Sequence, residues 1–176
     1  DWGPEAMLYT LQLYHQRGWG LYGGGENIDA ARAPLKLEVN GNKIAFLGCN
    51  GKPSGYATAS EKAPGAYHCR MDEMVSTVQA LRAEGYQVIF TFQHLEYYEY
   101  KARPALQADF QAVADAGAVI VSGSQAHVPH AIELRNGSFI HYGLGNMFFD
   151  QYVYEDKTQP TDKAFIDQHT FYDGRY

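Results

Sequence analysis

Hydrophobic positions in the middle of the chain follow a helical period and then a strand pattern, twice in succession. From Met71 apolar residues recur at helical spacing up to Gly85, and residues 88–92 form a run that is apolar except for Thr91. The same order returns with an apolar helix face over 106–114, a glycine stop and a second apolar run at 118–121. Uninterrupted apolar strands are typical of parallel strands covered on both faces. The pattern therefore predicts two consecutive helix-strand units with parallel strands.

Two Asn-Gly pairs predict a hairpin on each side of these units. Asn-Gly suits the type I′ turn, whose two central residues both need positive φ. Each pair stands between runs that read as strands: 35–39 and 43–48 around Asn40-Gly41, and 131–135 and 138–142 around Asn136-Gly137.

The remaining segments complete a layered α/β arrangement. We expect a first helix over 4–16, a loop over 49–70 without structure of its own, a polar loop over 151–159 and a last strand around 164–171. Hairpins joined to parallel units require a mixed sheet, and helices over its faces give a layered α/β sandwich. The chain, residues 1–176, is predicted to be one domain.

Composition limits the classes of function. The chain is 45% hydrophobic and 14% aromatic, which excludes disorder. Its formal charge is −6, and its 14 basic residues are scattered, so we expect no nucleic-acid partner. No apolar run approaches the ~20 residues that cross a bilayer. Because the chain starts at Asp1 without a basic and apolar leader, we interpret it as a fragment of a longer protein.

Cys49 and Cys69 stand at the two ends of the 49–70 loop. In an exported protein they would close this loop with a disulfide, which would stabilise the fold by about 3 kcal/mol. In a cytosolic protein they would be two free, buried thiols. The sequence leaves both possibilities open.

Polar residues follow both predicted parallel strands at their carboxyl ends. Ligands bind at this edge of open α/β sheets, so we expect the two loops to converge. Imidazole, carboxamide and carboxylate groups at one point suit a divalent metal, which can activate a bound water. The alternative is that the histidines are hydrogen-bonded structural residues. The side chains are Gln93, His94 and Glu96 after the first strand, and Ser124, Gln125, His127 and His130 after the second.

Other candidate sites have weaker support. The loop Gly23-Gly24-Gly25-Glu26-Asn27 resembles a phosphate cradle but lacks a Lys-Ser/Thr pair and a strand directly before it. His141 alternates with Ile140 and Tyr142, so we expect its side chain on the opposite face of the sheet. Covalent catalysis is disfavoured, because no Gly-x-Ser-x-Gly elbow is present and neither cysteine has a patterned His partner.

Three segments carry a family resemblance: residues 123–129 read Gly-Ser-Gln-Ala-His-Val-Pro, residues 136–137 read Asn-Gly, and residues 142–150 read Tyr-Gly-Leu-Gly-Asn-Met-Phe-Phe-Asp. They are similar to the Gly-x-His-Pro-His-Val, Asn-Gly and Tyr-x-Leu-Gly-Asn-x-x-Phe-Asp pattern of the capsule-synthesis CapA family, also called poly-γ-glutamate synthesis proteins. Residues 23–34 and 43–48 are similar to its Gly-x-Gly-x-Asn-x-x-x-Ala-Arg-x-Pro and Lys-Ile-Ala-x-Leu-Gly motifs. The resemblance covers nearly the whole chain and implies a fold like that of calcineurin-type metallophosphoesterases.

The resemblance also implies what the chain belongs to and where it acts. Asp1 and Gly3 look like the end of the family's Asn-His-x-x-Asp-x-Gly motif, so the chain would be the carboxyl-terminal part of a larger, N-terminally incomplete domain. It would act outside the cytoplasm, at the cell surface or in the periplasm. Its partners would be an anionic polymer or its precursor and a membrane-bound synthase.

Site residues follow from the same resemblance. A divalent metal of unknown identity would be held by His94, His127, Gln125 and Gln93. His127 and Glu96 would act as acid/base residues, while Asn146 and Asp150 would orient the ligands. The family commonly has His where this chain has Gln93 and Gln125, and a carboxamide oxygen binds hard cations but is a poorer zinc ligand than imidazole.

Three functions remain open at this point. The first is synthesis, export or hydrolysis of an anionic capsule polymer of poly-γ-glutamate type, with a metal-dependent, hydrolase-like site. The second is a non-catalytic binding or scaffold protein of a polymer-synthesis complex that has lost its metal. The third is a generic metal-dependent phosphoesterase or peptide hydrolase.

Overall fold

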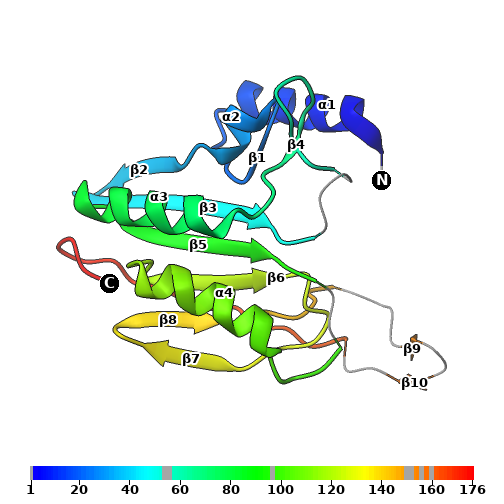
Figure 1. Cartoon of the computed structure of the whole chain (residues 1–176), viewed down its shortest axis with the longest axis vertical. Helices are drawn as coiled ribbons and strands as arrows, with labels where there is room; N and C mark the ends of the chain where they lie inside the picture. The colour runs from blue at the N-terminus through cyan, green and yellow to red at the C-terminus, as the bar shows by residue number, and fades with distance from the viewer. Residues whose placement is uncertain (1, 53–56, 96–97, 149–152, 155–156, 159–160) are drawn as a thin grey trace.

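A six-stranded mixed sheet forms the centre of the computed structural model (Figure 1), which describes residues 2–52, 57–95, 98–148, 153–154, 157–158 and 161–176. The inner strands are parallel, and each edge strand pairs antiparallel with its neighbour, so the predicted mixed sheet is confirmed. In spatial order the strands are β2 (Leu35–Val39), β3 (Asn42–Asn50), β5 (Gln87–Gln93), β6 (Ile120–Ser124), β8 (Ser138–His141) and β7 (Ile132–Arg135).

Both predicted hairpins are present at the edges of this sheet. Asn40 and Gly41 have φ values of 49° and 77°, and Asn136 and Gly137 have 50° and 84°. Two consecutive positive φ values match the type I′ turn that Asn-Gly favours. The local sequence therefore determines the hairpin at each edge of the sheet.

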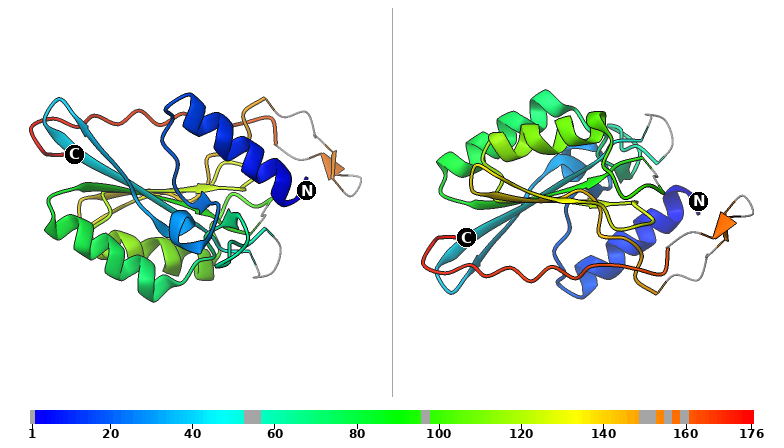
Figure 2. Two further views of the ribbon diagram at one scale, coloured as in Figure 1. Left: turned by 90° about the horizontal axis from the view of Figure 1, so that it is seen from above. Right: turned by 90° about the horizontal axis from the view of Figure 1, so that it is seen from below.

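Two helices cover one face of the sheet, α3 (Met71–Ala83) and α4 (Pro104–Asp115) (Figure 2). Both predicted helix-strand units are thus confirmed. In the core between helices and sheet, the Phe92 and Phe110 rings stack with centroids 4.5 Å apart. Residues buried to 2% exposure or less include Leu47, Met74, Val78, Phe90, Phe92, Phe110 and Ile140.

The opposite face is covered by α1 (Gly3–Gln16) and by the C-terminal segment, residues 161–176, rather than by a second layer of paired helices (Figure 2). The strand expected around 164–171 is wrong, because this segment forms no ladder there beyond one bridge between Ala164 and Gly145. It lies across the sheet face and is held mainly through side chains, such as Asp167 against His141.

The 49–70 loop has structure of its own, contrary to expectation. Its β4 (Gly65–Ala66) pairs antiparallel with β1 (Gly24–Gly25), which precedes the short helix α2 (Ile28–Arg32). A Cβ on Gly65 would lie 2.5 Å from the Ala57 carbonyl oxygen, so only glycine permits this approach. Cys49 and Cys69 form a disulfide, so they are not the two free thiols that the sequence left open.

The polar segment 151–159 also differs from the expected loop. It contains β9 (Val153–Tyr154), which pairs antiparallel with β10 (Lys157–Thr158). Such a short strand pair depends on local backbone hydrogen bonds. The sequence of this segment shows no hydrophobic alternation, which is the pattern that predicts a strand.

Candidate functional site

A small cavity of about 210 Å³ lies at the carboxyl ends of the parallel strands. We call it the strand-end cavity. Asn50, Gln93 and Ser124 line it from the last positions of β3, β5 and β6. Register places Asn50 beside Gln93 and Gln93 beside Ser124, so parallel pairing alone brings the three together. The remaining wall comes from Tyr22, Gly23, Gly48, Cys49, Ala66 and Thr91.

The two glutamines predicted to converge are in direct contact. Gln93 Nε2 donates a hydrogen bond to Gln125 Oε1 over 2.7 Å. Gln125 has a φ of 75°, a left-handed conformation that turns the chain sharply after β6. The Ser124 hydroxyl donates to the Phe92 carbonyl over 3.2 Å. The predicted meeting of these two loops is therefore confirmed, while the function of Gln93 and Gln125 as metal ligands stays a prediction.

His94 lies beside this site but does not line the cavity. Its side chain is buried, and Nε2 lies 3.1 Å from Asp109 Oδ2 on α4. The ring also packs edge-on against Phe92. This contact fits the structural alternative for His94, which ties the end of β5 to the helix layer.

His127 is held by an aromatic ring and by an asparagine. Its imidazole stacks on Tyr98 with centroids 5.1 Å apart and planes 14° from parallel. Asn146 Nδ2 donates to the His127 carbonyl over 3.0 Å and to the Thr161 carbonyl over 3.2 Å. Asn146 thus positions the His127 loop against the C-terminal segment, while its role in orienting metal ligands stays a prediction. The other two predicted site residues, Glu96 and Asp150, lie outside the described residues.

The described donor set fits a resident metal poorly. No three His, Cys, Asp or Glu side chains of the described residues lie close enough to hold one ion. Of the predicted ligands, Gln93 and Gln125 offer neutral carboxamide oxygens, and His94 faces Asp109. Hard cations in proteins are bound largely by carboxylates. The described part of the cavity instead presents amides and hydroxyls that exchange hydrogen bonds.

Sequence reasoning missed several residues of the cavity, above all Asn50 and Gly23. Asn50 ends the strand that enters the core, and that position is the same signal that identified Gln93 and Ser124. The glycine loop was set aside as a phosphate cradle, yet a Cβ on Gly23 would lie 3.3 Å from the Gly48 carbonyl oxygen. Glycine therefore allows this loop to close over β3.

The disulfide is part of the cavity wall. Cys49 lines the cavity, and its partner Cys69 lies two residues before Met71, where α3 begins. On the next residue, Asn50 N donates to the Tyr67 carbonyl over 2.7 Å and Cys69 N donates to the Asn50 carbonyl over 3.0 Å. Tyr67 N in turn donates to the Gly23 carbonyl over 2.9 Å. Cross-link and hydrogen bonds thus join three sides of the cavity into one unit.

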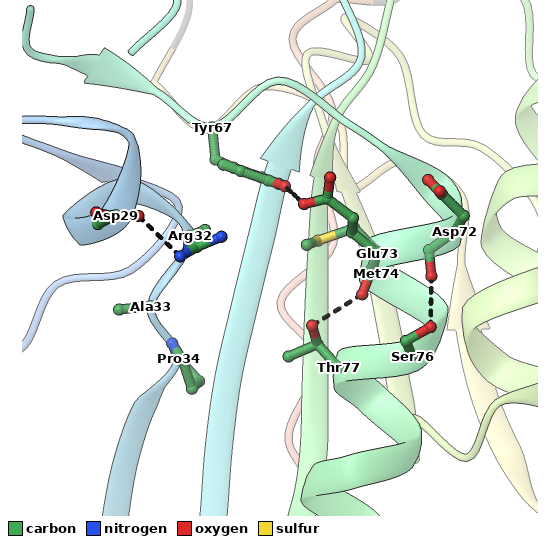
Figure 3. A pocket seen from close by; sticks show the side chains of 10 residues that line it. All are labelled: Asp29, Arg32, Ala33, Pro34, Tyr67, Asp72, Glu73, Met74, Ser76 and Thr77. Atoms are coloured by element: carbon green, nitrogen blue, oxygen red, sulfur yellow. Dashed lines mark hydrogen bonds and ion pairs between the residues drawn. The ribbon is translucent and has the colours of Figure 1, made fainter. Parts of the chain in front are cut away.

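A larger cavity of about 610 Å³ lies between α2 and the first turns of α3 (Figure 3). Its polar groups pair with each other. The Tyr67 hydroxyl donates to Glu73 over 2.5 Å, and Arg32 pairs with Asp29 at 2.8 Å. Burial, followed by the bond to Glu73, raises the pKa of Tyr67 to about 12, and the bonds from Tyr67 and then Arg70 lower the pKa of Glu73. This network fastens the 66–70 segment to α3.

Comparison with known proteins places the chain in a family. Residues 1–151 match the family described as bacterial capsule synthesis protein PGA_cap, and the chain belongs to this family. It is 26% identical over 173 residues to a capsule biosynthesis protein CapA of Bacillus anthracis, covering 96% of this chain and 41% of the relative. It is also 26% identical over 170 residues to a PGA biosynthesis protein CapA of Bacillus subtilis, covering 96% of this chain and 44% of the relative.

A more distant relative is a Mycobacterium tuberculosis protein named as a probable polyglutamine synthesis accessory protein. It is 25% identical over 162 residues, covering 85% of this chain and 42% of the relative. The chain spans less than half the length of these relatives. The layered sheet agrees with the metallophosphoesterase-like fold that the resemblance implied. Within the described residues, no helix has the length and apolar character needed to cross a bilayer.

Proposed function

We propose that this chain is the polymer-binding part of an accessory protein for the synthesis of an anionic capsule polymer of poly-γ-glutamate type. Family membership and the names of the relatives support a role in polymer synthesis. The observation that carries the binding role is the strand-end cavity, with the amides of Asn50 and Gln93 and the hydroxyl of Ser124 at adjoining strand ends.

Neutral amides and hydroxyls suit such a polymer. They donate hydrogen bonds to carboxylates and exchange them with peptide groups. The chain has a formal charge of −6, so general electrostatic attraction does not favour a polyanion. Binding then depends on the local arrangement of donors, and this makes it selective.

The proposed location is outside the cytoplasm, with a membrane-bound synthase as partner. The Cys49–Cys69 disulfide supports this proposal, because disulfides persist in oxidising compartments and are rare in the cytosol.

The second candidate is a metal-dependent hydrolase acting on the polymer, a phosphoester or a peptide. Its specific support is the direct contact of Gln93 with Gln125, in the loop that also carries His127. The resemblance implies that His94, His127, Gln125 and Gln93 would hold a divalent cation, but His94 faces Asp109 and the two glutamines offer only neutral carboxamide oxygens. His127 and Glu96 would be the acid/base residues of such an enzyme.

Elemental metal analysis separates the two candidates. Intact protein, a His127→Ala variant and a His15→Ala control on exposed α1 are analysed together. If the intact protein and the His15→Ala control contain near-stoichiometric metal and His127→Ala does not, the result supports the hydrolase. Metal-free protein supports the accessory role if it binds a fluorescent poly-γ-glutamate oligomer, followed by anisotropy, more tightly than a poly-α-glutamate of equal length and charge. Equal affinity for the two polymers contradicts the accessory role.

A further inference from the structure

A third cavity, of about 590 Å³, lies apart from the strand-end cavity and shares no lining residue with it. Three segments form it: the loop before α4, the loop between β6 and β7, and the C-terminal segment. Its walls are mainly apolar and include Pro129, Ala131 and two aromatic residues, Tyr100 and Phe165. Small-molecule sites are typically concave, mostly apolar and about 300–1,000 Å³ in volume. This cavity has that character.

His130 contributes a buried polar group to this cavity. The residue is 4% exposed, and its backbone N donates to the Gly143 carbonyl over 2.9 Å. A Cβ on Gly143 would lie 3.0 Å from the His130 ring, so glycine makes room for the imidazole. Burial lowers the pKa of His130, opposed by the Glu99 carboxylate, and the ring is therefore neutral near pH 7. The imidazole already interacts with the Tyr142 backbone, so it forms part of the cavity wall.

Lys163 supplies the single full charge among the lining residues. It is exposed, and its ammonium group forms no ion pair within the part of the chain that the structure describes. The cavity therefore has aromatic and apolar walls, a neutral polar group and one free cation near its mouth.

We infer that this cavity binds a small amphipathic anion, with an aromatic or short alkyl body against the apolar walls that include Tyr100 and Phe165 and one carboxylate at Lys163. Apolar contact supplies most of the affinity, and the carboxylate selects the ligand. An exposed ion pair contributes up to about 1 kcal/mol, which corresponds to about a five-fold preference for the carboxylate over a neutral analogue. The inference is independent of polymer binding at the strand-end cavity.

A matched pair of probes tests the inference, 4-phenylbutyrate and its neutral amide 4-phenylbutanamide. Each is titrated into the isotope-labelled full chain and followed through backbone amide chemical shifts. We expect shifts at His130, Ala131 and residues 163–165, and about three-fold to five-fold tighter binding of the carboxylate. Lys163→Gln should abolish this preference and leave amide binding unchanged. Lys62→Gln, at an exposed lysine that does not line the cavity, is the control and should preserve the preference.

A second variant tests the position of the site independently of charge. Ala131→Trp places a large ring at an exposed wall position and should prevent binding of both probes. Shifts confined to the strand-end cavity, no shifts at all, or a carboxylate preference that survives Lys163→Gln would each overturn the inference.

Discussion

Gln93 and Gln125 meet at the ends of neighbouring parallel strands, where the side-chain amide of Gln93 donates to the side-chain oxygen of Gln125 over 2.7 Å. Gln93 is exposed, and a neutral hydrogen bond at such a position contributes only about 0.5–1.5 kcal/mol to stability. The pair orders two loops at the mouth of the strand-end cavity, and its position there suggests ligand recognition rather than fold stability.

The Gln93→Ala variant should separate recognition from stability. We expect the free energy of unfolding to change by less than about 1 kcal/mol, because the side chain is exposed and neutral. Affinity for a poly-γ-glutamate oligomer should fall about five-fold or more, since one donor is lost and Gln125 is released. Urea unfolding and anisotropy measure the two effects. Gln12→Ala on exposed α1 should change neither, and unchanged affinity in Gln93→Ala would argue against this site.

Loss of the disulfide should destabilise the fold. The cross-link closes a loop with a sequence separation of 20, for which chain entropy gives about 3 kcal/mol. Adding a reductant during urea unfolding should lower the free energy of unfolding by about this amount. A Cys49→Ser/Cys69→Ser variant should match the reduced protein and show no response to reductant. Equal stability with and without reductant would contradict the prediction.

The buried pair of His141 and Asp167 should anchor the C-terminal segment. His141 is fully buried, its Nδ1 lies 2.7 Å from Asp167 Oδ2, and its Nε2 has no hydrogen-bond partner among the described residues. Asp167→Ala should lower the free energy of unfolding by about 2 kcal/mol. The reason is that Nδ1 of His141 would then be buried without a hydrogen-bond partner, in addition to Nε2. Limited proteolysis should then cut within 161–176 more rapidly. Asp162→Ala, an exposed change in the same segment, is the control, and equal cleavage rates would refute the anchoring role.

Acidification should weaken the fold partly through His130. Burial lowers the pKa of His130 from its ordinary value of 6.5, so the unfolded chain takes up a proton at higher pH than the folded one. The contribution of His130 to stability is therefore complete above about pH 6.5 and is lost as the pH falls toward the folded pKa. His169, whose pKa is also lowered by burial, acts in the same direction.

Free energies of unfolding measured from about pH 7.5 to about pH 5 test this linkage. On acidification, the free energy of unfolding should fall less steeply in His130→Gln than in the unmodified protein. The fall that remains in His130→Gln should be due in part to His169. His15→Gln, at an exposed position of α1, should show the same dependence of unfolding free energy on pH as the unmodified protein. Identical slopes in all three proteins would show that His130 does not carry the effect.

Local patterns in the sequence determined most of the sheet. The largely apolar strands at 88–92 and 118–121, the glycine after each helix and the two Asn-Gly turns each act over a few residues, so their consequences can be predicted without knowing the fold. Alternation along a strand likewise placed His141 opposite Ile140, and His141 does contact the C-terminal segment. Parallel pairing of two strands then sufficed to bring Gln93 and Gln125 together.

Tertiary contacts decided what those local patterns leave free. The direction of the His94 side chain depends on Asp109 of α4. The wall of the strand-end cavity depends on the close approach of Gly23 to Gly48. The disulfide depends on where the two ends of the 49–70 loop meet. The C-terminal segment reads as a strand by composition, yet it is held on the sheet face by side chains such as Asp167. Side-chain partners distant in sequence set these features, whereas strand and helix periods are set by near neighbours.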